Sequence, residues 1–344
     1  MNGDPAELLR MAGGLAEKGV TAFVPTTLAG PWDQITRAVD AVAAAMRQPG
    51  RGARILGVHL EGPYFHPAQR GAQNLAHLAT PRPEDYLPLL DRYSIIRRVS
   101  AAPELPGALE LGQELRRRGI VAAIAHSDAT YQQVVTAVEH GYSHVTHLFS
   151  GMSTVKRIDA YRVSGVLEAA LLLDELTTEI IADGHHLPPS LMRLALKNKG
   201  LDRICLVSDA MEAAGLGAGN YQLGGLAVVV EAAIPEVFEI PTQARNRVAK
   251  LADRSAFAGS VATMDQLVRN LVQWVGLDIL DAVRLATFNP ARLEGIDHET
   301  GSIAKGKRAD LIVFDQDVEV QLTMVAGELV VNKLSGMTPG ARGE

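Results

Sequence analysis

Apolar residues along this chain gather into short β-branched runs, which alternate with longer segments in which apolar positions recur every three or four residues. The short runs are 20–26, 55–60, 95–101, 120–125, 144–148, 177–182 and 204–208. Helical candidates between them include 32–46, 108–118, 132–139 and 189–198. Near-continuous apolar strands that alternate with helices are typical of a parallel sheet covered on both faces. The pattern therefore predicts an α/β fold, and the number of units favours a (β/α)8 TIM-like barrel.

The two ends of the chain modify this prediction. A helix-like segment already begins near Pro5, so we expect the first barrel strand to be absent. Near the other end, 301–314, 318–322 and 323–331 predict short strands, which we interpret as the remnant of a small β-sandwich. We therefore predict a barrel domain over 1–300, the C-terminal part of a β-sandwich over 301–335 and a tail over 336–344.

Segment 231–253 does not follow the strand–helix alternation. It contains two prolines and mixed charge, and its apolar residues show no clear period. We expect an irregular insertion in the barrel here and assign it no chemistry.

Composition and charge narrow the function. The chain has 344 residues with 33 basic and 39 acidic side chains, and no basic block, so nucleic acid is not an expected partner. No apolar run is long enough to span a membrane and no signal peptide opens the chain, which predicts a cytoplasmic protein. The single cysteine, Cys205, lies in an apolar strand-like run and is expected to be a packed, inert thiol.

Polar side chains stand where four of the apolar runs end. Glu61 follows 55–60, His126 follows 120–125, His147 lies near the end of 144–148, and Asp209 follows 204–208. The carboxyl ends of parallel barrel strands converge on one face, where active sites lie. One Glu and two His suit Zn²⁺, and Fe or another divalent transition metal could take the same ligands. Asp209 is then a candidate to move a proton.

Each of these residues also has a purely structural interpretation. Taken alone, Glu61 could assist a helix cap and Asp209 could form a turn. His59, His140 and His144 are expected to be ordinary core or surface histidines. The joint occurrence of four polar residues at four strand ends nevertheless favours a site that binds one divalent metal ion.

Several segments of the chain resemble the N-acetylglucosamine-6-phosphate deacetylase family of amidohydrolases. The glutamate-ligand segment is matched by 59–65 and 70–73, and the two histidine-ligand segments are matched by 125–130 and 146–149. The resemblance continues through 181–186, 207–211, 257–260, 289–292 and 309–311. It covers essentially the whole chain except 231–253.

The resemblance implies a reaction and a role for each matching residue. Glu61, His126 and His147 would bind the metal, and Asp209 would act as general base and then as acid. Hydroxide would attack the acetamide carbonyl of an amino sugar phosphate, releasing acetate and an amine. The residues implied to line the substrate pocket are Ala72, Gln73, Ser150, Gly151, Arg162, His186, Phe257, Ala258 and Gly259. Because phosphate contacts in the family come partly from a neighbouring subunit, a homodimer is expected, with Arg162 as the phosphate partner.

The chain departs from the family at three places. Gln73 stands where the family usually has a histidine, Ser150-Gly151 replaces Asn-Ala, and the loop 153–161 is longer. These departures keep two further hypotheses open. One is a related amidohydrolase that acts on another N-acyl or cyclic amide, and the second is a truncated, catalytically idle protein that binds a sugar phosphate.

Overall fold

A curled sheet of parallel strands forms the centre of the molecule. The computed structural model describes all residues except 1–2, 49, 235–238, 240–246 and 335–344. Six parallel strands pair in the order β10-β9-β6-β5-β4-β3. They are β3 (Val58–Glu61), β4 (Ile96–Ala101), β5 (Val121–Ile124), β6 (Tyr142–Val145), β9 (Thr177–Ile180) and β10 (Ile204–Leu206). Beyond β3, β1 (Ala22–Phe23) runs parallel to β2 (Arg54–Ile55), and Thr26 bridges His59.

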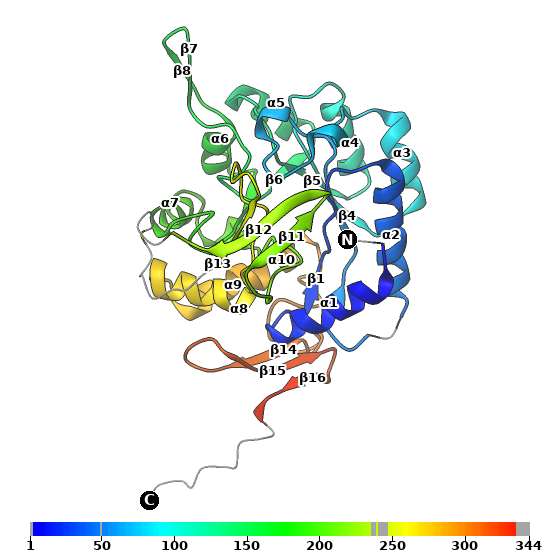
Figure 1. Cartoon of the computed structure of the whole chain (residues 1–344), viewed down its shortest axis with the longest axis vertical. Coiled ribbons are helices and arrows are strands. Elements are labelled where there is room, and N and C mark those ends of the chain that lie inside the picture. The colour runs from blue at the N-terminus through cyan, green and yellow to red at the C-terminus, as the bar shows by residue number, and fades with distance from the viewer. Residues whose placement is uncertain (1–2, 49, 235–238, 240–246, 335–344) are drawn as a thin grey trace, which may run out of the picture.

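Helices cover the outside of this sheet, as Figure 1 shows. They are α1 (Pro5–Glu17), α2 (Trp32–Met46), α3 (Pro83–Arg92), α4 (Ala108–Arg117), α5 (Tyr131–Glu139), α6 (Val166–Leu172), α7 (Pro189–Lys199), α8 (Met264–Asn270), α9 (Ile279–Ala286) and α10 (Phe288–Leu293). A π-helical turn, Leu271–Val275, follows α8, and 3₁₀ turns span Pro67–Gln69, Leu75–His77 and Leu201–Arg203. Local sequence explains several boundaries; for example, Thr130 and Gln133 form a capping box that starts α5.

The predicted α/β barrel-like fold is confirmed, and its strands follow one another in chain order from β1 to β10. Among the described residues, β10 pairs only with β9, and no ladder joins β10 to β1. The helices predicted at 32–46, 108–118, 132–139 and 189–198 are α2, α4, α5 and α7, with ends that shift by at most one residue. None of the described helices is both long enough and apolar enough to cross a membrane.

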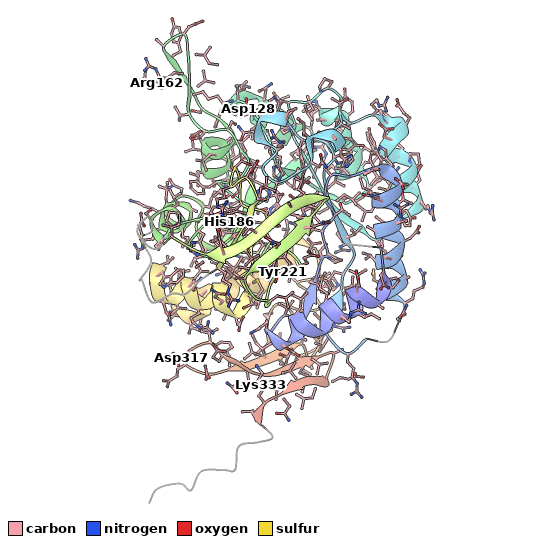
Figure 2. All side chains as sticks on the ribbon, in the orientation of Figure 1. Asp128, Arg162, His186, Tyr221, Asp317 and Lys333 are labelled. Carbon is pink, nitrogen blue, oxygen red and sulfur yellow. The ribbon has the colours of Figure 1, made fainter. Side chains whose placement is uncertain are left out.

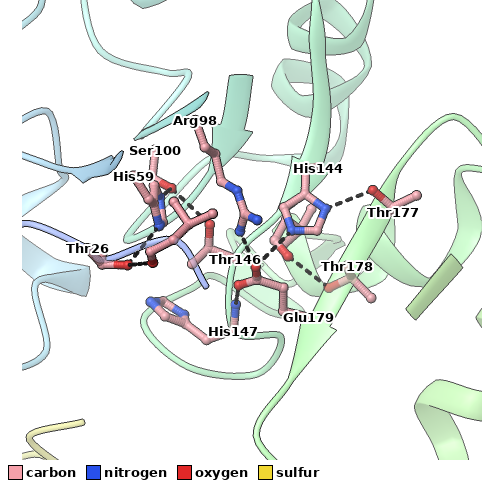
Figure 3. Close-up of polar contacts among 12 residues, drawn as sticks. Thr26, His59, Arg98, Ser100, His144, Thr146, His147, Thr177, Thr178 and Glu179 are labelled. Carbon is pink, nitrogen blue, oxygen red and sulfur yellow. Dashed lines mark hydrogen bonds and ion pairs between the residues drawn. The ribbon is translucent and has the colours of Figure 1, made fainter. Parts of the chain in front are cut away.

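The barrel interior contains an ionic network as well as apolar residues. Arg98 on β4 is buried and pairs with Glu179 on β9 and, at 2.7 Å, with Glu294 after α10. Figure 3 shows this arginine pointing toward Glu179, beside His144 and close to His147. Arg97 on the same strand also pairs with Glu294, at 3.4 Å, so the network balances two guanidinium groups with two carboxylates, and removal of one carboxylate would leave a guanidinium charge without compensation.

A small antiparallel sheet includes both ends of the irregular insertion expected at 231–253. Its strands are β11 (Gly219–Leu223), β12 (Leu226–Ala232) and β13 (Arg247–Leu251). The expectation of irregular structure is therefore wrong at both ends of the segment, because β12 and β13 pair with each other; most of the stretch between them lies outside the described residues. Figure 1 shows the sheet crossing the middle of the view. It packs its apolar face on Met211, Ala213 and Ala258.

A second β-hairpin, β7 (Lys156–Ile158) and β8 (Tyr161–Val163), extends away from the body of the barrel (Figure 1). It lies within the long loop noted in the sequence. Its two turn residues, Asp159 and Ala160, both have positive φ, which is the conformation that a tight two-residue hairpin turn requires. The root of the hairpin is held by Glu168, which accepts hydrogen bonds from Thr154 Oγ1 and Gly165 N, each at 2.7 Å.

The C-terminal strands form a three-stranded antiparallel sheet that packs on α1. They are β14 (Leu311–Phe314), β15 (Val320–Val325) and β16 (Glu328–Asn332), so β15 runs across the boundary expected at 322–323. Thr323 Oγ1 donates to the carbonyl of Ala16 at 2.8 Å. The division into a barrel domain and a β-sandwich remnant stays a prediction, and the predicted tail at 336–344 lies outside the described residues.

Candidate metal centre and active site

Three buried side chains from three strand ends converge at one end of the barrel. Glu61 is the last residue of β3, while His126 follows β5 and His147 follows β6. Glu61 Oε1 lies 3.2 Å from His126 Nε2 and 3.4 Å from His147 Nε2. One ligand atom from each residue lies within 4.8 Å of the other two. The structure thus brings together the three residues predicted as metal ligands.

The backbone at these strand ends is strained. His126, His147 and Asp209 have φ values of 47°, 30° and 44°, in the left-handed region that side chains other than glycine rarely occupy. Each residue lies directly beyond a barrel strand, where the chain turns sharply. Such conformations cost free energy, and they persist where surrounding contacts determine them, frequently at functional sites.

His126 is oriented from behind by the segment after β3. Its Nδ1 donates to the carbonyl of Gln69 at 2.8 Å, which leaves the Nε2 lone pair directed toward Glu61 and His147. Gly151 packs against the same edge of the imidazole, and a Cβ there would lie 2.7 Å from His126 Nδ1. The glycine expected to line the substrate pocket is therefore also needed to make room for His126.

The donor set fits a divalent metal ion. Two imidazole nitrogens and one carboxylate oxygen are a common ligand set for a catalytic transition-metal ion with an open position. Burial opposes ionisation of Glu61, but the imidazoles of His126 and His147 beside it hold the pKa of this carboxyl well below its usual value. Burial also opposes protonation of His147, but Glu61 outweighs it and raises the pKa of His147 to about 9.

Asp209 faces this cluster from the end of β10. Solvent reaches its side chain, yet the surrounding protein displaces enough water to raise the pKa of Asp209 to about 7. The nearby Glu61 carboxylate acts in the same direction, while His147 and His186 oppose it. Because the pKa is also sensitive to positive charge, a cation in the cluster would lower it again. The arrangement suits a carboxyl group that gains and loses a proton near neutral pH.

His186 is held by a residue to which the sequence analysis gave no role. Asp183 Oδ2 accepts a hydrogen bond from His186 Nδ1 at 2.7 Å, and Asp183 Oδ1 accepts from the backbone N–H of His186 at 2.8 Å. Burial lowers the pKa of His186, but Asp183 outweighs it and raises the pKa above its usual value. The spacing of three residues within Asp-Gly-x-His was the available signal for this pair.

Phe257, Ala258 and Gly259 lie between His186 and Asp209. The ring of Phe257 is 4.8 Å from that of His186, and Ala258 donates to Ala249 on β13. Gly259 has φ +65°, and a Cβ there would lie 2.9 Å from the Asp209 carbonyl oxygen. The structure therefore places this predicted pocket segment beside the cluster.

Gln73 contacts the metal-ligand cluster directly. Its Oε1 accepts from Ala29 N at 2.9 Å, and its Nε2 donates to Glu61 Oε1 at 3.4 Å. In the described structure its carboxamide is thus engaged with a ligand residue, and its contact with a scissile carbonyl stays a prediction. Ala72 packs on the small β11–β13 sheet, and Ser150 donates its backbone N–H to the His147 carbonyl.

Arg162 is the one predicted site residue that lies away from this end of the barrel. It is exposed on β8, and Figure 2 shows it on the hairpin that extends beyond the barrel, away from His186. A substrate bound beside His186 is therefore not in reach of the same chain's Arg162 in this conformation.

Three other histidines, His59, His140 and His144, and the cysteine have the structural roles expected of them. His59 is buried with Nε2 2.7 Å from Ser100 Oγ, and burial, assisted by Arg98, lowers its pKa to about 4. His144 Nδ1 contacts Thr177 Oγ1 at 2.7 Å, and His140 Nδ1 donates to the Thr136 carbonyl. Burial raises the pKa of Cys205 to about 12, so its thiol is inert.

Comparison with known proteins agrees with this geometry. The sequence model of the amidohydrolase family matches residues 6–330. The chain is 33% identical to the N-acetylgalactosamine-6-phosphate deacetylase of Escherichia coli O157:H7, over 96% of this chain and 82% of that protein. It is 34% identical to the N-acetylglucosamine-6-phosphate deacetylase of Vibrio furnissii, over 92% of this chain and 74% of that protein.

A solved structure is similar over the same span. It is a mutant N-acetyl-D-glucosamine-6-phosphate deacetylase from Mycobacterium smegmatis in complex with N-acetyl-D-glucosamine-6-phosphate. The TM-score is 0.84 at 33% identity, and the match covers 96% of this chain and 84% of that chain. Family model, relatives and fold agree with one another. The chain belongs to the N-acetylglucosamine-6-phosphate deacetylase family of amidohydrolases.

Proposed function

We propose that this protein hydrolyses the N-acetyl amide of N-acetylglucosamine 6-phosphate to glucosamine 6-phosphate and acetate. The observation that carries the proposal is the buried Glu61–His126–His147 cluster with Asp209 on the facing strand end, in a chain whose relatives bear this activity in their names. The phosphorylated substrate also supports the prediction that the protein acts in the cytoplasm.

We propose Zn²⁺ as the ion that Glu61, His126 and His147 hold. The two Nε2 atoms and one carboxylate oxygen suit it, although Fe²⁺ and other divalent transition metals accept the same ligands. When bound, such an ion lowers the pKa of water and polarises a carbonyl group. The Gln69 carbonyl supports this role by fixing the His126 tautomer, and Gln73 does so by donating to Glu61.

Asp209 carries the proton through the reaction. Its carboxylate takes a proton from the attacking water as oxygen adds to the acetamide carbon. The same carboxyl group then donates that proton to the amide nitrogen as the carbon–nitrogen bond breaks, so the proton balance closes. Loss of water raises the pKa of Asp209 and a nearby cation lowers it, so the carboxyl group can both accept and donate a proton near neutral pH.

The sugar phosphate is held by groups around Asp209 and by a second subunit. His186, oriented by Asp183, and the Phe257–Gly259 segment border the reacting carboxyl group. Gln73, Ser150 and Gly151 lie next to the metal ligands, while Ala72 packs on the cluster that contains Ala258. Since Arg162 projects away from its own site, we propose that it reaches the phosphate bound by the other subunit of a homodimer.

The test is acetate release from N-acetylglucosamine 6-phosphate by the Zn²⁺-supplemented protein, with Asp209→Asn beside it. We expect the substitution to reduce kcat by roughly 10²–10⁴-fold, the usual contribution of a general acid–base group. Asp317→Asn is a matched control, because it makes the same change at an exposed turn of the C-terminal sheet (Figure 2). Equal activity of the wild type and the Asp209→Asn protein would contradict the assignment.

The galactosamine epimer is a second candidate substrate. The relative from Escherichia coli O157:H7 is an N-acetylgalactosamine-6-phosphate deacetylase and is 33% identical to this chain, while the N-acetylglucosamine-6-phosphate deacetylases of Vibrio furnissii and Bacillus subtilis are 34% and 33% identical. A comparison of kcat/KM for the two epimers decides between them. Lack of acetate release from both epimers would instead favour a different N-acyl or cyclic amide as the substrate, or a catalytically idle protein.

A further inference from the structure

The protruding β7–β8 hairpin brings two arginines side by side. Arg157 on β7 and Arg162 on β8 are directly opposed in the antiparallel ladder, next to the Ile158–Tyr161 pair that closes the turn. Residues directly opposed across two strands project to the same face, with Cβ atoms about 5 Å apart. The two-residue turn at Asp159 and Ala160 fixes this register, because a shorter or longer turn would change the pairing.

Nothing in the described chain neutralises these two charges. Both arginines are exposed, and neither forms an ion pair with a carboxylate among the described residues; Arg162 Nη1 donates only to the Ala160 carbonyl at 3.1 Å. Like charges directly opposed across a ladder destabilise a hairpin. The neighbouring pair, Ile158 and Tyr161, projects to the other face and is 53% and 76% exposed. The hairpin thus has one cationic face and one apolar face.

Contacts with the barrel fix the root of the hairpin that carries Arg157 and Arg162. Lys156, at the start of β7, forms an ion pair with Asp128, and Glu168 holds the backbone on either side of the hairpin. The two guanidinium groups are therefore presented on a positioned arm, which lowers the entropy lost when they bind a ligand. Two adjacent guanidinium forks match the geometry and charge of a phosphate monoester dianion.

We propose that Arg157 is a second phosphate-binding residue and that Arg157 and Arg162 together form a clamp for a phosphate monoester. This inference rests on the proposed function, because the phosphate is that of the substrate bound by the other subunit. The family resemblance implied Arg162 alone; Arg157 comes from the long loop that departs from the family. The clamp makes the phosphate a determinant of substrate specificity.

The test compares KM and kcat of the wild type and Arg157→Ala on N-acetylglucosamine 6-phosphate and on unphosphorylated N-acetylglucosamine. Loss of a charged hydrogen-bonding partner predicts an increase of about tenfold or more in KM for the phosphorylated substrate only. Arg162→Ala should have a similar effect, and Arg157→Lys should restore part of the loss. Arg51→Ala, at another exposed loop, is the matched control and should change neither constant.

Two kinetic outcomes would overturn the clamp. One is an unchanged KM in Arg157→Ala beside a raised KM in Arg162→Ala, and the other is an equal increase for both substrates. If the wild type releases no acetate, the proposed function fails separately from the clamp. Calorimetric titration with glucosamine 6-phosphate then tests the clamp directly. Weaker binding by Arg157→Ala than by Arg51→Ala supports it, and equal binding refutes it.

Discussion

The end of the barrel and the β7–β8 hairpin position their nitrogen-bearing side chains in opposite ways. In the barrel, the histidines beside Glu61 are buried, and the Gln69 carbonyl, Gln73 and Gly151 surround them. On the hairpin, Arg157 and Arg162 stand in solvent with no carboxylate partner in the described part of the chain. At the end of the barrel, contacts from the same chain fix the positions of the side chains on all sides. On the hairpin, such contacts fix only the root.

This difference separates two kinds of functional residue. A buried site is positioned by many contacts, so substitutions there change stability, metal binding and catalysis together. An exposed arm contributes little to the stability of its own chain, so substitutions there should change ligand binding alone. Four substitutions test this division, and the changes that we expect from them decrease from the metal ligands to the hairpin root.

Substitution of a metal ligand should have the largest effect. His147→Ala should remove bound metal and reduce acetate release by roughly 10³-fold or more, because the metal stabilises the transition state by several kcal/mol. Metal content is measured by elemental analysis after dialysis, and activity by acetate release. His298→Ala, an exposed histidine outside the barrel, is the control. Full metal content in the His147→Ala protein would show that the ligand set is wrong.

Disruption of the buried ionic network should change stability more than any substitution on the hairpin. Glu179→Gln leaves Arg97 and Arg98 to share the single carboxylate of Glu294, so one guanidinium charge loses its compensation, and the free energy of unfolding should fall by about 3–5 kcal/mol, as for other broken buried pairs. Urea unfolding of Arg157→Ala should be indistinguishable from that of the wild type. If both proteins unfold at the same urea concentration, the contrast between the two regions is lost.

Substitution of the residue that orients His186 should have an intermediate effect and change the pH profile. Asp183→Asn removes the carboxylate that raises the pKa of His186, so this pKa should fall. His186 should then lose its proton at a lower pH than in the wild type. We expect kcat/KM to decrease about tenfold, with its alkaline limb moved to lower pH. An Asp183→Asn profile that overlays the wild-type profile would remove His186 from the site.

Substitution of Asp128, which links the two regions, should have the smallest effect. Asp128 accepts a hydrogen bond from Gln69 Nε2 at 2.7 Å and pairs with Lys156 at the hairpin root, while the Gln69 carbonyl orients His126. Asp128→Ala should loosen this chain of contacts and weaken Zn²⁺ binding about two- to fivefold, less than the roughly 10–100-fold typical of a direct partner of a metal ligand. Competition with a chelator measures it, and unchanged affinity would mean that the regions are independent.

Much of the fold and part of the site were predictable from the sequence for local reasons. Near-continuous apolar runs mark strands that are buried on both faces, and period-3.6 patterns mark helices that are buried on one face. These patterns located β4 and α2 almost to the residue. Glu61, His126 and His147 were recognisable because polar residues interrupt apolar runs at their ends. Strand β13 was missed because the prolines and charges before it obscure the apolar pattern.

Side-chain partners leave no trace in these patterns. Neither the hydrogen bond from His126 to the Gln69 carbonyl nor the one from His186 to Asp183 produces a periodic signal. The pairing of Arg98 with Glu294 joins residues 196 positions apart, which only the packing of the barrel brings together.

The order of residues along the chain was enough to specify the strand–helix alternation and the polar residues at the strand ends, because both follow from which neighbouring residues are apolar. The polar residues at the strand ends in turn indicate the chemistry available to this protein. The packing of the folded chain set the rest. It oriented the imidazole of His126 and raised the pKa of Asp209. These properties depend on distances between atoms of residues far apart in the sequence, and the order of residues does not specify those distances.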